Sequence, residues 1–479
     1  MQSLFWESGK MDFDLREFSI HGLHGVRTLR IPISDGKLIL VGINGLGKTT
    51  VTTILYRVLS RQWAKLLDFR FDYLTLRFSD VEQIISRADI ESSILNWTRI
   101  RRLLPGYALG RLRKNPELIS QLLSSGRSGN EIFRLSEELE VSPAAIERIL
   151  SLPMQSQREL FELERQQDEQ DKPVVALSDY LSKHVTQQIL YLPTYRRIEK
   201  DLKTIFPKLE EQVRRFHRSE EQGDKPSLQY VELVEFGMED VAAKFESTIT
   251  ALKETARAEL NAVVGTYLRE VIRGEARVED VPKIQRLDDN TIARALNRVE
   301  ERTLSQDEKT RLRDLIFQIK LKAGKSLSVE DAYIARFFSK LVTLDQVLSA
   351  RESSIKSFVG VCQGYLHGKA FTYDEQNYRI HLQLDSGRPM DLRDLSSGEK
   401  QIVSLFAHLY LEQQKSFVVI IDEPELSLSV DWQRKLLPDI VQSGRCSFLA
   451  AATHSPYVID NELEPYAQDL AESVEVVEG

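Results

Sequence analysis

A glycine-rich loop between an apolar run and a helical stretch constrains the fold of this chain more than any other feature. Residues 42–49 read Gly-Ile-Asn-Gly-Leu-Gly-Lys-Thr, which is the pattern of a phosphate-binding loop. The apolar run at residues 38–41 predicts a buried strand before the loop, and the apolar spacing after Lys48 predicts a helix. Strand, loop and helix in this order are the context that such a loop requires. We therefore expect an α/β fold built around a P-loop head with a mixed sheet.

Each position of the loop has a chemical role in nucleotide binding. The glycines let the backbone approach phosphate oxygens and direct its amides at them. Lys48 supplies a cation to the β- and γ-phosphates, and Thr49 offers its hydroxyl to magnesium. The helix that begins there adds the positive end of its dipole. We expect ATP and Mg²⁺ as cofactors, with nucleotide contacts from Gly42, Asn44, Gly45, Gly47, Lys48, Thr49 and Thr50.

A second apolar strand, at residues 417–421, ends in Asp422 and Glu423. We predict that Asp422 holds magnesium through water and that Glu423 orients and polarises the attacking water. The alternative is that the two acids only cap a helix. His454 follows another buried strand and is predicted to sense the γ-phosphate, although a lone histidine is usually a satisfied core or surface residue. The predicted catalytic residues are Lys48, Glu423 and His454, and the predicted metal ligands are Thr49 and Asp422.

Residues 395–399 read Leu-Ser-Ser-Gly-Glu, the signature that ATP-binding-cassette engines place across the nucleotide of a partner subunit. Ser396 and Glu399 form an S-x-x-E capping box, which predicts the start of a helix. The positive end of that helix, with Ser397 and Gly398, would face a γ-phosphate. Because one chain cannot easily present this element to its own phosphate loop, we expect ATP to lie between two subunits. The alternative is an ordinary capped helix.

The long interval between the two motifs predicts additional domains. Residues 100–172 are polar and helical in character and are interpreted as an insertion. Apolar residues at steps of three or four predict a long amphipathic helix over 241–271 and a second helix over 334–348. These helices either pack into a globular body or form an outgoing and returning arm, which would be short because no long heptad repeat is present. The predicted parts are an ATPase head (1–99, 173–235 and 361–479), the helical insertion (100–172) and a helical arm or dimerisation region (236–360).

Composition limits the class of protein. The chain has 479 residues, of which 42% are hydrophobic and 28% charged, which is typical of globular proteins with a large core or two domains. It lacks a signal-peptide pattern and an apolar run of membrane-spanning length, and its two cysteines lack metal-ligand spacing; we therefore expect a cytoplasmic protein. The net charge of −8 does not indicate nucleic-acid binding. A local basic cluster from Arg99 to Lys114 could bind DNA or an acidic protein, or be a solvated helix face.

The motifs occur together, in order, in a known superfamily. Gly-x-Asn-Gly-x-Gly-Lys-Thr, Leu-Ser-Ser-Gly-Glu, Asp-Glu-Pro-Glu-Leu and Thr-His-Ser-Pro make the chain similar to the ABC-type ATPases related to the recombination and SMC families. More narrowly, residues 191–199, 234–241 and 431–433 resemble the AriA-like ATPases of the PARIS anti-phage defence systems. The resemblance implies a homo-oligomer, at least a dimer and up to a hexamer. It further implies that the chain holds a Toprim-type nuclease of the AriB kind and releases it when a phage trigger protein is sensed.

Three functions compete at this stage. The first is a defence ATPase that restrains or delivers a nuclease, and the second is a DNA-repair ATPase of the RecF type that binds DNA directly. The third, a transporter motor, is disfavoured because the interval between Lys48 and the signature far exceeds that of a transporter cassette. The short stretch after His454 is too small for a Toprim domain, so we expect the nuclease to be a separate chain.

Overall fold

The computed structural model describes residues 13–91 (except 26 and 44), 93, 136, 141, 172–194, 230–233, 238–274, 281–299, 301, 303–322, 328–412 and 416–476. The chain forms two compact units, Met1–Val234 with Ser416–Gly479, and Glu235–Lys415. Nearly all of the predicted insertion, the basic cluster from Arg99 to Lys114 and residues 195–199 lie outside the described residues. The proposed division into an ATPase head, an insertion and an arm stays a prediction. None of the described helices has the length and apolar character needed to cross a membrane.

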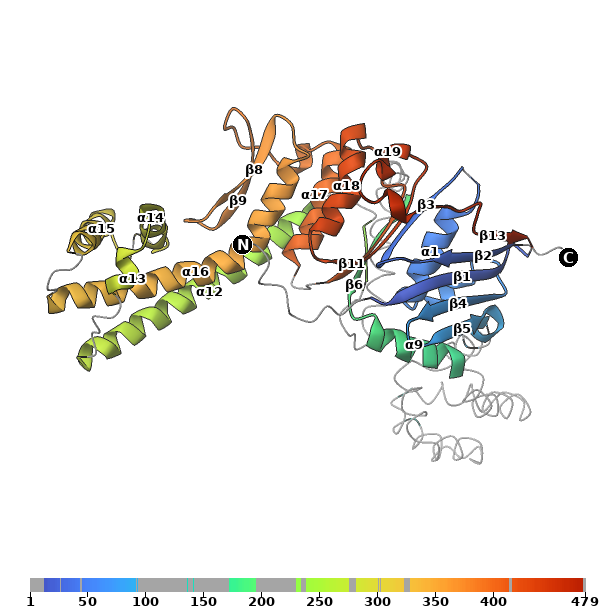
Figure 1. Cartoon of the computed structure of the whole chain (residues 1–479), viewed down its shortest axis with the longest axis horizontal. Helices are drawn as coiled ribbons and strands as arrows, with labels where there is room; N and C mark the ends of the chain where they lie inside the picture. Colours follow the sequence, from blue (N-terminus) through green and yellow to red (C-terminus); the bar gives the residue numbers. More distant parts are fainter. Residues whose placement is uncertain are drawn as a thin grey trace. The chain divides into compact units, whose positions relative to one another are not determined.

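A parallel sheet forms the centre of the first unit (Figure 1). Each pair of neighbouring strands in it runs parallel. The central strand β10 is buried at every position, as expected for a sheet covered on both faces. All carboxyl ends therefore meet at one edge. The strand order is β12 (Ala467–Asp469), β3 (Lys37–Val41), β11 (Cys446–Ala452), β10 (Phe417–Asp422), β6 (Gln188–Leu192) and β7 (Tyr230–Glu232).

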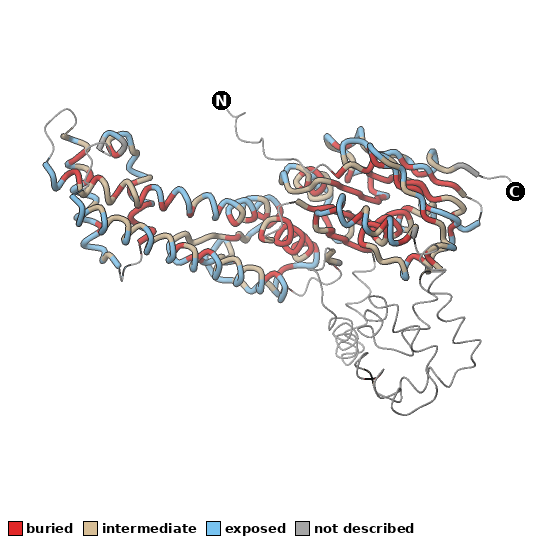
Figure 2. Tube along the Cα trace, turned by 90° about the horizontal axis from the view of Figure 1, so that it is seen from below, coloured by how far each residue is buried: buried red, intermediate tan, exposed pale blue. Residues whose placement is uncertain are grey.

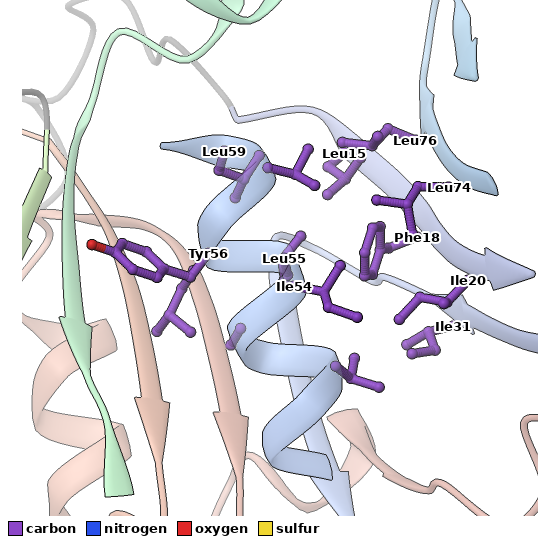
Figure 3. Packing of buried hydrophobic residues seen from close by; sticks show 14 of the residues in the cluster. Leu15, Phe18, Ile20, Ile31, Ile54, Leu55, Tyr56, Leu59, Leu74 and Leu76 are labelled. Carbon is purple, nitrogen blue, oxygen red and sulfur yellow. The ribbon is translucent and has the colours of Figure 1, made fainter. Parts of the chain in front are cut away.

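A second, antiparallel sheet lies in the same unit, and helix α1 (Lys48–Leu59) packs between the sheets. Ile54 and Leu55 face Phe18 of the antiparallel sheet (Figure 3). On the other side Tyr56 stacks on Tyr191 of β6 with ring centroids 4.1 Å apart. The phosphate loop is therefore followed by a helix fixed on two sides by apolar contacts. The strand order is β13 (Val474–Val476), β2 (Arg27–Pro32), β1 (Leu15–Leu23), β4 (Tyr73–Phe78) and β5 (Glu82–Ser86).

Short helices complete the first unit. Trp63 donates its indole N–H to the Ser178 hydroxyl over 2.9 Å, and Tyr180 packs on Phe78 with ring centroids 5.0 Å apart. These contacts hold two helices against the edge of the antiparallel sheet. Among the described residues of this unit, the helices besides α1 are α2 (Trp63–Leu66), α9 (Lys172–His184), α18 (Val430–Gln442), α19 (Pro456–Ile459) and the 3₁₀ turn η4 (Glu464–Tyr466).

Two long helices run antiparallel in the second unit, α12 (Glu239–Ile272) and α16 (Val329–Gln363). The aromatic pairs Phe245–Phe358 and Tyr267–Phe337, with centroids 5.3 and 5.0 Å apart, lie at opposite ends of the contact. At 34 residues, α12 spans about 50 Å. Its buried residues are Val241, Leu252 and Ala256, and exposed or intermediate positions predominate along the long helices of this unit (Figure 2). Both predicted helices are confirmed. Shorter helices pack beside α16, namely α13 (Val281–Gln285), α14 (Asp289–Asn297) and α15 (Gln306–Leu321).

A buried ion cluster joins α14, α16 and the hairpin of β8 (Lys369–Asp374) and β9 (Arg379–Leu384). The Arg298 guanidinium donates to Asp345 over 3.1 Å, to Glu352 and to Glu375. Burial alone would lower the pKa of Arg298, but the carboxylates of Glu352 and Asp345 raise it above its usual value. Buried charges need such partners. The cluster therefore holds the β8–β9 hairpin in place against α14 and α16.

The hairpin leads through the 3₁₀ turn η3 (Leu392–Asp394) into α17 (Ser397–Leu411), which is buried along most of its length. The predicted α/β fold is thus confirmed. Its strands separate into one parallel and one antiparallel sheet in the first unit, together with the small β8–β9 hairpin in the second.

Candidate nucleotide-binding site

The phosphate loop leaves β3 and turns into α1 through glycines with positive φ. Gly45 has a φ of 89° and Gly47 a φ of 100°, in the left-handed region that favours glycine. No heavy atom lies within 4 Å of where a Cβ would stand on either residue. At these two glycines the backbone of the loop is therefore open to an approaching group.

The amino end of α1 lacks a side-chain cap. Gly47 is the N-cap residue, and it makes no side-chain cap to the first turn. Amides without an intrahelical partner, combined with the helix dipole, make such an end an anion site. Lys48 is 8% exposed, and its ammonium donates to the carbonyl oxygens of Gly42 and Ile43 over 2.6 and 3.2 Å. The ammonium of Lys48 therefore lies against the phosphate loop, as the sequence predicts.

The carboxylate of Asp422 lies directly beside the first turn of α1. It is fully buried, and its Oδ1 accepts a hydrogen bond from Thr49 Oγ1 over 3.1 Å. Its Oδ2 accepts from the hydroxyl of Thr194. Hydroxyl and carboxylate oxygens are hard ligands of the kind that Mg²⁺ prefers, and Mg²⁺ usually keeps several waters. The donor set of Thr49 and Asp422 therefore fits a magnesium ion.

Thr194 was not among the predicted site residues. It comes two residues after β6, which pairs with β10 along its whole length. Because carboxyl ends of neighbouring parallel strands meet at one edge, a polar residue just past β6 belongs near Asp422. Its position two residues past the end of β6 is the signal in the sequence that points to it.

Glu423 has a strained backbone. Its φ is 50°, in a region that is uncommon for residues other than glycine. Its N–H donates to the carbonyl oxygen of Ala452 over 2.8 Å, so the pairing of β10 with β11 continues one residue past Asp422. Strain of this kind clusters at functional sites, where the surrounding structure enforces it. The side chain is half-buried and starts at the edge of the sheet that carries the phosphate loop.

His454 follows β11 at the same edge. Its side chain is 47% exposed, and Nδ1 lies 2.9 Å from Oε1 of Glu425, whose side chain is only 7% exposed. Glu425 was not predicted as a site residue, although it stands in the Asp-Glu-Pro-Glu-Leu motif. No spacing rule shows from the sequence that a carboxylate after β10 meets a histidine after β11.

Ser397 and Gly398 belong to the second unit, at the start of α17. The predicted capping box is present, because Glu399 N–H donates to Ser396 Oγ over 3.4 Å and Ser396 N–H donates to Glu399 Oε2 over 2.8 Å. Burial alone would raise the pKa of Glu399, but hydrogen bonds from Ser396 and Lys369 lower it. Ser397 is exposed and Gly398 buried.

The first unit thus brings together most of the predicted site residues. Asp422 ends β10, and Gly42, Gly45, Gly47, Lys48, Thr49, Thr50, Glu423 and His454 follow β3, β10 or β11 at the carboxyl edge of the parallel sheet. Asn44 lies outside the described residues.

Comparisons with known proteins fit this geometry. Residues 268–460 match a family model described as "AAA domain, putative AbiEii toxin, Type IV TA system", which is less than half of the chain. This range includes the signature, Asp422, Glu423 and His454. No curated protein matches the chain. Together with the phosphate loop, the match indicates a nucleotide-binding ATPase domain of the P-loop type.

Two solved structures are similar over almost the whole chain. One is the Smc head domain with an extended coiled coil bound to the C-terminal domain of ScpA, from Pyrococcus furiosus, with 11% identity, 97% of this chain and 96% of that chain covered, and a TM-score of 0.35. The other is the Smc head domain with a coiled coil and joint from Pyrococcus yayanosii, with 15% identity, 93% of each chain covered and a TM-score of 0.28. Likeness at these scores does not by itself define a fold.

Proposed function

We propose that the chain hydrolyses ATP with Mg²⁺ as an ABC-type ATPase. The observation that carries the proposal is the contact of Thr49 with Asp422, because it joins the phosphate loop to the acidic end of β10 over 3.1 Å. In P-loop ATPases these two elements share one magnesium ion. The match of residues 268–460 to an AAA domain supports the same activity.

Each residue of the site then has a role toward ATP. The open amides of the loop and of the first turn of α1 bind phosphate oxygens. Lys48 offers its ammonium to the β- and γ-phosphates, and Thr49 and Asp422 hold Mg²⁺, which neutralises phosphate charge when bound. Glu423 takes a proton from the attacking water. His454 faces the γ-phosphate or that water from the end of β11.

We further propose that a second subunit completes the site. Ser397 is exposed at the amino end of a 15-residue helix, whose dipole favours an anion. Ser396 occupies the N-cap with its hydroxyl bonded to Glu399, whereas Ser397 in the first turn is exposed and would offer its hydroxyl to a ligand. This element would meet the γ-phosphate held by the phosphate loop of the partner.

The biological role proposed here is a sensor and scaffold in anti-phage defence. The AriA-like segments support it, and so does the family description that names a putative toxin of a toxin–antitoxin system. In this role the oligomer holds a separate Toprim-type nuclease and releases it when a phage trigger protein binds. No observation on the described residues favours the DNA-repair alternative, in which the chain binds DNA directly.

The catalytic proposal is tested by substitution at Thr49. Thr49→Val keeps the shape of the side chain but removes the hydroxyl that bonds to Asp422, so Mg²⁺-dependent release of phosphate from ATP should be lost. Thr49→Ser restores a hydroxyl at the same place and should retain turnover. Equal turnover in the valine variant and the parent protein would refute the assignment of the site.

The defence role needs a separate test, because ATP turnover alone does not establish it. The chain should co-purify with a Toprim-type nuclease encoded beside it, and the purified chain alone should leave DNA and RNA intact with Mg²⁺ or Mn²⁺. Nuclease activity that disappears on substitution of this chain's own carboxylates would contradict the scaffold role.

A further inference from the structure

Glu425 accepts hydrogen bonds from two groups of the segment that carries His454 and lies close to a third. Its Oε1 accepts from the backbone N–H of His454 over 3.0 Å and lies 2.9 Å from Nδ1 of the same residue. Its Oε2 accepts from the Thr453 hydroxyl over 2.8 Å. Because the carboxylate is 7% exposed, little water competes for these bonds, and hydrogen bonds are stronger in such surroundings.

A chain of hydrogen bonds continues from Thr453. The Thr453 hydroxyl accepts from Ser455 N–H over 3.0 Å, and the Ser455 hydroxyl donates to Gln433 Oε1 over 2.6 Å. Gln433 in turn donates to the carbonyl oxygen of Leu428 over 3.0 Å. The segment after β11 is thus tied to the segment after Glu423, with Glu425 at the centre.

We propose that Glu425 is the positioning residue that fixes the ring orientation and the tautomer of His454. Without a proton on Nδ1, its lone pair would face a carboxylate oxygen 2.9 Å away and the two would repel each other, so Nδ1 is the nitrogen that carries the proton. Nε2 then points away from Glu425. Carboxylates orient the general bases of hydrolases and metal-bound histidines in the same manner.

This assignment determines what His454 can do to a nucleotide, and at this step it rests on the proposed ATPase function. With Nδ1 protonated, a neutral imidazole offers only a lone pair at Nε2 and can accept a hydrogen bond from water. The imidazolium form instead donates from Nε2 and suits a phosphate oxygen. Glu425 thereby excludes the neutral form that would donate to phosphate from Nε2.

The tautomer can be measured on the protein without nucleotide. Protein labelled with ¹⁵N-histidine is studied by long-range ¹H–¹⁵N correlation at about pH 9, where the ordinary histidine side chain is neutral, and the His454 signals are assigned by their loss in His454→Asn. We expect Nδ1–H in the parent protein. Glu425→Ala should lose this preference, and Glu425→Gln should keep it, because an amide oxygen beside Nδ1 still favours a proton on that nitrogen. The exposed Glu464 provides a matched control, Glu464→Gln.

Turnover provides the second readout. Glu425→Ala should lower kcat by about 10- to 100-fold, as seen when carboxylates that orient histidines are removed, with KM for ATP close to that of the parent. Glu425→Gln should restore most of the loss.

The tautomer measurement and the turnover measurement test different claims. A parent protein with Nε2–H, or an alanine variant that keeps the Nδ1–H tautomer, overturns the role of Glu425 whatever the turnover shows. Should the alanine variant not fold, the parent tautomer decides alone. Absence of ATP hydrolysis in the parent protein would contradict the proposed function but not the hydrogen bonds of Glu425.

Discussion

Thr49 donates its hydroxyl proton to Asp422 over 3.1 Å, and the two residues lie 373 positions apart in the chain. The first belongs to the helix after the phosphate loop, and the second ends the central strand of the parallel sheet. Their contact depends on β11, which pairs with both β3 and β10 and sets their ends level. The chemistry proposed above follows from this alignment.

Lys48→Ala should abolish ATP binding or turnover. The ammonium lies against the phosphate loop, and without it no side-chain cation of the loop reaches the β- and γ-phosphates. ATP binding is measured by equilibrium dialysis and turnover by phosphate release. Lys65→Ala, at an exposed lysine close to the end of α1, is the matched control and should behave as the parent. Unchanged turnover in Lys48→Ala would be incompatible with the assigned site.

Glu423→Gln should keep ATP binding and stop hydrolysis. The amide preserves the size of the side chain but cannot take a proton from water. ATP should therefore stay intact on the purified variant, which can be quantified by chromatography of the nucleotide after denaturation. Hydrolysis at the rate of the parent protein would show that Glu423 is not the base.

Glu270→Gln should destabilise the α12–α16 pair in a pH-dependent manner. Hydrogen bonds from Arg336 lower the pKa of Glu270 from 4.5 to about 2, with a smaller contribution from Lys340. Since the pKa in the folded protein lies below the unfolded value, this stabilisation is complete above about pH 4.5 and is lost as the pH falls toward about 2.

The effect of Glu270→Gln is measured by thermal unfolding. At about pH 7 the loss should be about 1 kcal/mol, or roughly 2–4 °C in Tm, and the difference from the parent should shrink at about pH 3. Glu254→Gln, at an exposed position of α12, is the control. A Tm difference that is the same at both pH values would contradict the ion pair.

Local signals predicted part of this site and could not predict the rest. The phosphate loop, the acids after β10 and the Ser396–Glu399 capping box each depend on neighbours a few residues apart, so spacing alone reveals them. Thr194 and Asp422 are 228 positions apart, and Glu425 and Thr453 are 28 apart. Those pairs meet only because β6, β10 and β11 align in one parallel sheet. Local sequence signals do not give the order of the strands in the sheet, so they do not determine which strand ends lie side by side.

The fold shows the same division. Strand β10 and the two long helices follow apolar patterns, and they lie close to where the sequence predicts them. The separation of the strands into two large sheets did not follow from periodicity, because that pattern reports burial and not pairing. The contact of Arg298 with Asp345 and Glu352 is likewise a tertiary feature without a local signal.

The central claim is that one subunit binds ATP and another completes its site. Ser397→Arg should leave nucleotide binding to the subunit intact but block turnover, because the longer cationic side chain obstructs the approach of α17 to the partner's nucleotide. Lys48→Ala should be inactive for the separate reason given above. In a mixed oligomer of the two variants, one composite site combines the intact phosphate loop of the first with the intact signature of the second.

The most direct measurement is therefore phosphate release from a mixture of Ser397→Arg and Lys48→Ala protein, with subunit exchange confirmed by differently tagged chains. The mixture should recover part of the parent turnover, while each variant alone should have none. No recovery in mixed oligomers whose exchange has been confirmed would contradict a site shared between subunits.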